Sequence, residues 1–128
     1  MKITRLPDPA AFEAFRPAAD DALCFYLFFG SEAPETGESW CPDCVMADPV
    51  IRATLSRITA RPVHLVECPV GDRAGYKGNA EHPYRQHPRV RLQRIPTIIR
   101  LEGPREVGRL VEGECLAPEA LLRLAAAE

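Results

Sequence analysis

The chain has 128 residues, of which 46% are hydrophobic and 27% are charged, and its formal net charge is −2. This length suits a single domain, 1–128, that buries one hydrophobic core. The nearly balanced charge offers no basic field for a nucleic acid or an anionic membrane surface, so we expect neither as a partner.

The first half of the chain predicts a strand–helix–strand unit after a short helix. Residues 9–19 have the spacing of that short helix, and the apolar run 22–29 is typical of a strand buried on both faces. The polar loop 30–39 leads into a longer helix, which Pro49 is expected to kink, and 62–67 forms the next strand. Two buried strands joined by a helix predict parallel pairing.

The second half predicts a short helix, a hairpin and a closing helix. The polar loop 71–78 precedes a short helix near 79–87. Residues 95–101 and 105–112 indicate two strands joined by a turn, and 118–127 has the pattern of a helix. This order predicts an α/β fold in which a central four-stranded mixed sheet is flanked by helices.

Two features of the sequence bear on location. The first nine residues contain no apolar stretch of the kind found in signal peptides, and the longest apolar run, 23–29, is too short to cross a bilayer. We therefore expect a soluble, cytoplasmic monomer. Thiols in that compartment are mostly kept reduced, so a disulfide formed there is usually transient and catalytic.

The pentapeptide Trp-Cys-Pro-Asp-Cys at 40–44 is the most informative motif. Two thiols at this spacing can close a disulfide within one helical turn, or can share a metal ion. Tetrahedral zinc needs two further ligands, but Cys24, Cys68 and Cys115 are isolated in the sequence and are expected to be structural. Redox exchange is therefore favoured, with a non-catalytic redox sensor or adaptor, or a metal-binding module, as the alternatives.

The flanking pattern suggests a role for each residue of the motif. Cys41 falls at the predicted helix start, where unpaired N–H groups and the helix dipole stabilise a thiolate, so we expect it to be the nucleophile. Cys44, one turn further in, would resolve the mixed disulfide. Pro42 suits the first helical position, and Trp40 would shield one side of the sulfur pair. Asp43 has an ambiguous effect, because it suits the helix dipole but its charge opposes a thiolate.

Two further segments are candidates for substrate contact. Ile95 and Thr97 flank Pro96 at the start of a predicted strand and would flank an extended substrate backbone. The acidic loop 31–38 has two interpretations. It is either a solvated insertion, or a lip beside Cys41 that narrows access and repels acidic partners.

Together these motifs resemble the thioredoxin fold and, within it, the thioredoxin domain-containing protein 17 family. The resemblance rests on the pentapeptide 40–44, on Pro49 eight residues after Cys41, and on Ile-Pro-Thr at 95–97. It implies a cis peptide bond before Pro96 and a cytosolic disulfide reductase with no bound cofactor. Electrons would come from NADPH through a thioredoxin reductase, and the substrates would be small or selected disulfides such as cystine, together with protein persulfides or nitrosothiols.

The chain also departs from thioredoxin itself. The strand 25–29 holds no carboxylate, whereas thioredoxin has a buried aspartate in the strand before its cysteines. The acceptor of the Cys44 proton is therefore open between Asp43 and water. Tyr76 stands where the family usually has tryptophan.

Overall fold

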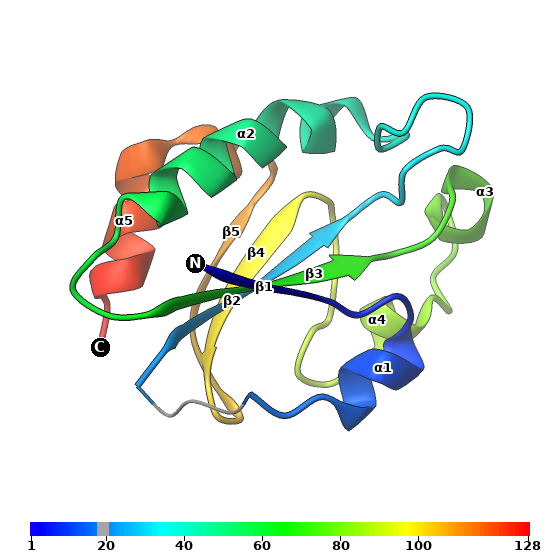
Figure 1. Ribbon diagram of the computed structural model, residues 1–128. Coiled ribbons are helices and arrows are strands. Elements are labelled where there is room, and N and C mark those ends of the chain that lie inside the picture. Colours follow the sequence, from blue (N-terminus) through cyan, green and yellow to red (C-terminus); the bar gives the residue numbers. More distant parts are fainter. Residues whose placement is uncertain (18–20) are drawn as a thin grey trace.

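A five-stranded mixed sheet forms the centre of the protein, in a computed structural model that describes residues 1–17 and 21–128 (Figure 1). The strands are β1 (Lys2–Arg5), β2 (Leu23–Phe29), β3 (Val63–Pro69), β4 (Thr97–Glu102) and β5 (Arg105–Val111). Their order is β1-β3-β2-β4-β5; β1, β3 and β2 run parallel, while β4 is antiparallel to both β2 and β5. The α/β class and the mixed sheet are as predicted, but the sheet has one strand more than expected.

The additional strand is β1, at one edge of the sheet. It pairs in parallel with β3, with Lys2 opposite His64 and Arg5 opposite Glu67. Its four residues are mostly exposed, so the segment lacks the apolar run or the alternation that marks a strand in the sequence. Residues 2–5 form a strand because they pair with the buried strand β3.

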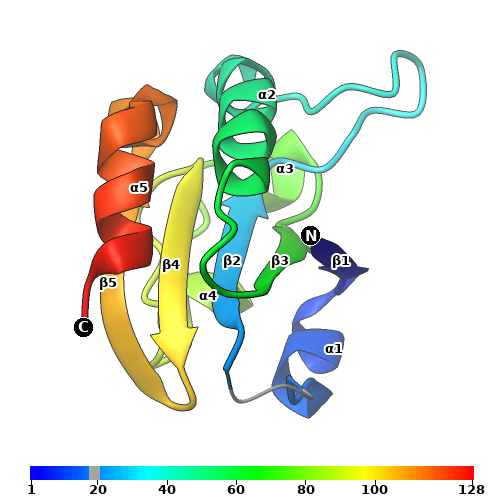
Figure 2. The ribbon, with the colours of Figure 1, turned by 60° about the vertical axis from the view of Figure 1, so that its left-hand side comes forward.

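Helices cover both faces of the sheet. They are α1 (Pro9–Ala14), α2 (Pro42–Ser56), α3 (Arg73–Tyr76), α4 (Pro83–Gln86), the 3₁₀ helix η1 (Glu112–Leu116) and α5 (Pro118–Ala126). Figures 1 and 2 show α2 and α5 against one face, with α1 and α4 on the other. In the described part of the chain, none of the helices is long and apolar enough to cross a membrane.

Several element boundaries differ from the prediction. The first helix ends at Ala14 instead of residue 19, and residues 18–19 of that prediction lie outside the described residues. The predicted loop 71–78 contains α3, which Asp72 caps by accepting a hydrogen bond from the Gly75 N–H at 2.8 Å. The long helix α2 continues through Pro49.

The two central strands supply the core. All seven residues of β2 and all seven of β3 are buried, as expected for strands covered on both faces. A buried arginine on β4, Arg100, donates hydrogen bonds to the carbonyl oxygens of Leu124, at 2.9 Å, and Ala125, at 3.0 Å. It satisfies carbonyls that the end of α5 leaves unpaired, and so ties this helix to the sheet.

A chain of ion pairs joins the edge strand to the long helix. Arg5 donates to Glu32 at 2.5 Å and to Glu67 at 3.3 Å, and Arg52 donates to Glu67 at 2.5 Å. Arg52 Nε also bonds both carboxylate oxygens of Asp48 at 3.0 Å. Although burial opposes it, the hydrogen bonding from Arg5 lowers the pKa of Glu32. The base of the acidic loop is thus attached to β1.

Candidate active site

The dithiol lies at the N-terminus of α2, where the sequence predicted it. Cys41 is the N-cap residue, and its Sγ accepts a hydrogen bond from the Cys44 N–H at 3.3 Å. Pro42 occupies the first turn, where its missing N–H leaves no bond unmade. The Cys41 Sγ also lies 4.0 Å from the carbonyl oxygen of Ile95. The helix N-terminus therefore presents N–H groups to the Cys41 sulfur.

The pKa values of the two thiols shift in opposite directions. A hydrogen bond from the Cys44 thiol, helped by the N–H groups of Cys44 and Asp43, outweighs burial and lowers the pKa of Cys41 to about 7. The same hydrogen bond, together with burial, raises the pKa of Cys44 far above its usual range. The carboxylate of Asp43 raises the Cys41 pKa, as its charge predicts, while the backbone N–H of the same residue lowers it.

The two sulfurs also adjoin different cavities. Their exposed fractions are similar, 6% for Cys41 and 4% for Cys44. A groove of about 580 Å³ lies in front of Cys41, and a second cavity of about 530 Å³ lies on the Cys44 side. The Cys41 groove is lined by Trp40, Cys41, Pro42, Asp43, Arg73, Tyr76, Lys77, Arg85, Gln93, Arg94, Ile95 and Glu112.

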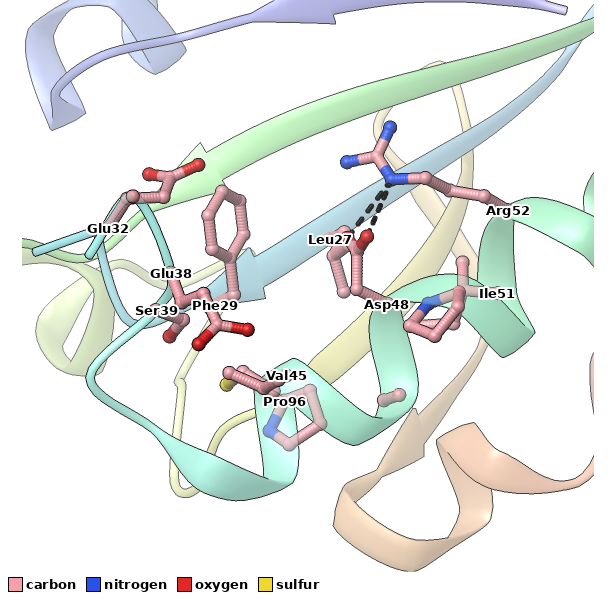
Figure 3. Close-up of a pocket in the computed structure, with 14 residues that line it drawn as sticks. Leu27, Phe29, Glu32, Glu38, Ser39, Val45, Asp48, Ile51, Arg52 and Pro96 are labelled. Carbon is pink, nitrogen blue, oxygen red and sulfur yellow. Dashed lines mark hydrogen bonds and ion pairs between the residues drawn. The ribbon is translucent and has the colours of Figure 1, made fainter.

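The Cys44-side cavity lies between α2 and the loop that precedes it (Figure 3). Leu27 and Phe29 of β2 form its apolar part. Glu38 and Asp48 bring carboxylates to it from the loop and from α2. Cys44 thus borders a partly apolar cavity that also holds carboxylates, although β2 itself carries no acid.

Ser39 is a functional candidate that the sequence reasoning missed. Its hydroxyl accepts a hydrogen bond from the Cys41 N–H at 3.1 Å, and it lines the Cys44-side cavity. Hydrogen bonds from the Gly30 N–H and the Ser39 hydroxyl partly offset the raised pKa of Cys44. Ser39 therefore accepts a hydrogen bond from Cys41 and also favours the thiolate of Cys44. The available signal was a serine two residues before the helix N-cap.

Trp40 is held tightly beside Cys41. Its Nε1–H donates to the carbonyl oxygen of Gly71 at 2.8 Å, and its ring centroid lies 6.1 Å from that of Tyr76. Trp40 also packs on Gly30, where an added Cβ would lie 2.7 Å from the indole Cε2. Trp40 therefore forms a fixed wall of the Cys41 groove.

The three residues predicted to contact substrate, Ile95, Pro96 and Thr97, lie in three different surroundings. The Ile95–Pro96 peptide bond is cis, as the resemblance implied. Ile95 lines the Cys41 groove and Pro96 lines the Cys44-side cavity. Thr97 is 1% exposed, and its hydroxyl donates to the Arg94 carbonyl at 2.6 Å. Its side chain lines neither of the two cavities beside the dithiol.

The acidic loop does not lie where the lip hypothesis placed it. Glu32 and Glu38 border the Cys44-side cavity, and neither lines the groove in front of Cys41. Glu32 is paired with Arg5 of β1, a strand that the sequence reasoning did not predict. Repulsion by these carboxylates would therefore act on the Cys44 side of the site.

The other cysteines pack inside the protein. Cys24, Cys68 and Cys115 are buried free thiols, and burial raises the pKa of each, to about 12 for Cys115. Over residues 1–17 and 21–128, no three His, Cys, Asp or Glu side chains group in a way that could hold a metal ion. These three thiols therefore lack the environment of a reactive cysteine.

Comparison with known proteins identifies the family. The description "Thioredoxin domain-containing protein 17-like, thioredoxin domain" matches residues 11–127. The chain belongs to this family. Thioredoxin-like protein Clot of Arabidopsis thaliana is 40% identical over 102 residues, which are 80% of this chain and 75% of that protein. Thioredoxin domain-containing protein 17 of Mus musculus is 37% identical over 107 residues, 81% and 80% of the two chains.

A solved structure supports the fold assignment. The germline-specific thioredoxin Deadhead of Drosophila melanogaster matches with a TM-score of 0.59 and 15% identity, over 96% of each chain. The protein thus has the thioredoxin fold. As a member of the thioredoxin domain-containing protein 17-like family, it is a thioredoxin-type redox protein.

Proposed function

We propose that this protein is a cytosolic thiol–disulfide reductase that acts through Cys41 and Cys44. The proposal rests on the position of the Cys41 sulfur at the start of α2, where it accepts a hydrogen bond from the Cys44 N–H. With a pKa of about 7, about half of Cys41 is thiolate at pH 7, against about 3% for an ordinary thiol of pKa 8.5.

The reaction takes place in two exchanges. The Cys41 thiolate attacks one sulfur of the substrate disulfide, forms a mixed disulfide, and releases the other half as a thiolate that takes up a proton from water. Cys44 then loses its proton and attacks the Cys41 sulfur, which releases the second half of the substrate. Two electrons have passed from the protein to the substrate, and Cys41 and Cys44 are left joined as a disulfide.

The proton of Cys44 leaves through the cavity on its own side. Asp43 lines the Cys41 groove and does not border this cavity, which favours water over Asp43 as the acceptor. Once the mixed disulfide forms, the Cys41 thiolate that raises the Cys44 pKa no longer exists, so Cys44 ionises more readily. Ser39 remains beside it as a hydrogen-bond partner for the new thiolate.

The catalytic cycle requires an external source of electrons. A thioredoxin reductase that oxidises NADPH would regenerate the dithiol, and no bound cofactor is needed for the exchange itself. The substrates would be small or selected disulfides, because Cys41, the attacking thiol, is only 6% exposed in the groove that it lines. A monomer suffices, because one chain supplies both thiols.

Single-residue variants test the two roles. Pre-reduced Cys41→Ser protein, mixed with cystine, should release no cysteine, whereas Cys44→Ser protein should accumulate a cysteine adduct on Cys41, detected by intact mass spectrometry. Cys24→Ala, which removes a thiol outside the site, should react like the wild type. Full cystine reduction by Cys41→Ser would contradict the proposal. Formation of the Cys41–Cys44 disulfide without substrate turnover would instead favour a redox sensor or adaptor.

A further inference from the structure

The groove in front of Cys41 has a basic rim, formed by Arg73, Lys77, Arg85 and Arg94. Arg73 and Lys77 come from α3 and the residue that follows it, Arg85 from α4, and Arg94 from the segment before β4. These elements are separate in the sequence and come together only in the folded protein. The whole chain carries a net charge of −2, so a groove lined by four cations is more basic than the protein as a whole.

The cations differ in how far they are neutralised. Arg94 is paired with Glu112 at 2.9 Å. Arg85 has its guanidinium carbon 4.0 Å from the centroid of the Tyr76 ring and donates to the Gln93 carbonyl at 2.8 Å, so it is fixed in place. Among the described residues, Arg85 forms no ion pair with a carboxylate.

Arg73 and Lys77 are the most available charges of the rim. Both side chains are exposed, and within 1–17 and 21–128 neither forms an ion pair. Apart from Glu112, Asp43 is the one carboxylate among the described residues that line this groove. The charged side chains that line the groove from α3 and the residue after it are therefore both cations.

We propose that this basic rim makes small disulfides with carboxylates a few bonds from the sulfur the preferred substrates, with Arg73 and Lys77 attracting the carboxylates while Cys41 meets the sulfur. The inference rests on the proposed function, because it assigns a substrate class to the same site. A groove of about 580 Å³ falls within the size range of small-molecule sites.

Three symmetrical disulfides provide the probes: dithiodipropionate with two carboxylates, bis(2-hydroxyethyl) disulfide with none, and cystamine with two ammonium groups. In a single turnover, Cys41 displaces one thiolate and Cys44 displaces the other, so each disulfide yields two thiols and one Cys41–Cys44 disulfide. Trp40 is the single tryptophan and lies beside Cys41, so its fluorescence follows the reaction. Each rate constant is divided by that of dithiothreitol with the same disulfide, which removes differences in intrinsic reactivity.

The decisive comparison is between two charge-matched double variants. Arg73→Glu/Lys77→Glu reverses the rim, whereas Arg57→Glu/Arg123→Glu makes the same change in net charge at exposed positions outside the groove. We expect the rim variant to lower the normalised rate with dithiodipropionate by roughly tenfold at low salt and to raise that with cystamine. At about 1 M salt, where the screening length is about 3 Å, both effects should shrink.

The outcomes separate this inference from the proposed function. If all three disulfides react at the same normalised rate, or if the remote double variant changes the rates as much as the rim variant does, the rim does not select substrates, but the reductase proposal stands. If the wild type reduces neither these three disulfides nor cystine, the reductase proposal itself fails. A preference for dithiodipropionate that Arg73→Glu/Lys77→Glu abolishes supports the inference.

Discussion

The hydrogen bond between the two thiols is the leading cause of the lowered Cys41 pKa, so removing the Cys44 thiol should raise that pKa. The Cys44→Ala variant keeps the backbone N–H that lies 3.3 Å from the Cys41 Sγ and the N–H of Asp43. We therefore expect the pKa to move from about 7 toward, but not fully to, the ordinary value of about 8.5.

The size of the effect follows from the thiolate fraction at a fixed pH. At pH 6 a thiol of pKa 7 is about 9% ionised, and one of pKa 8.5 is about 0.3% ionised. The rate of Cys41 alkylation by iodoacetamide at pH 6 should therefore fall by up to about 30-fold in Cys44→Ala. Because a lowered pKa favours the thiolate, the wild-type advantage should be largest below pH 7 and should vanish above about pH 9.

Alkylation is measured from pH 5 to 10 by mass spectrometry of the Cys41 peptide, which keeps Cys24, Cys68 and Cys115 out of the signal. Cys24→Ala serves as the control for loss of a thiol outside the site, and circular dichroism checks that each variant is folded. An unchanged midpoint in Cys44→Ala would refute the assigned cause. A wild-type midpoint near 8.5 would refute the lowered pKa itself.

Two further substitutions test the surroundings of the dithiol. Ser39→Ala removes the hydroxyl that accepts a hydrogen bond from the Cys41 N–H at 3.1 Å and that lowers the pKa of Cys44. Closure of the Cys41–Cys44 disulfide, followed by stopped-flow fluorescence, should therefore slow; an unchanged rate would exclude a role for this hydroxyl. Gly30→Ala places a Cβ 2.7 Å from Trp40 and should lower the free energy of unfolding by about 1–3 kcal/mol in chemical denaturation. At Gly113 an added Cβ meets nothing within 4 Å, so equal losses in Gly30→Ala and Gly113→Ala would contradict this packing argument.

The sequence predicted those elements whose cause is local. Seven continuous apolar residues make β2, and a cysteine followed by proline and aspartate marks the start of α2. These signals depend on neighbours within one strand or one turn. The positions of Cys41 and Pro42 were therefore correct before any tertiary contact was known.

What the sequence could not provide depends on residues far apart in the chain. The strand β1 exists because Lys2–Arg5 pairs with β3, about 60 residues away, and its own pattern is that of an exposed segment. The side on which the acidic loop lies was also missed, because the Arg5–Glu32 pair joins the loop to that unpredicted strand. The basic groove likewise forms from α3, α4 and the segment before β4.

The central claim is that Cys41 and Cys44 together pass two electrons to a disulfide. The most direct measurement mixes fully reduced wild-type protein with one equivalent of cystine, blocks remaining thiols, and maps the cysteines by peptide mass spectrometry. We predict one new disulfide, between Cys41 and Cys44, with two cysteines released and with Cys24, Cys68 and Cys115 still reduced. A stable cysteine adduct on any residue, or a disulfide that involves one of the three buried thiols instead, would contradict the account.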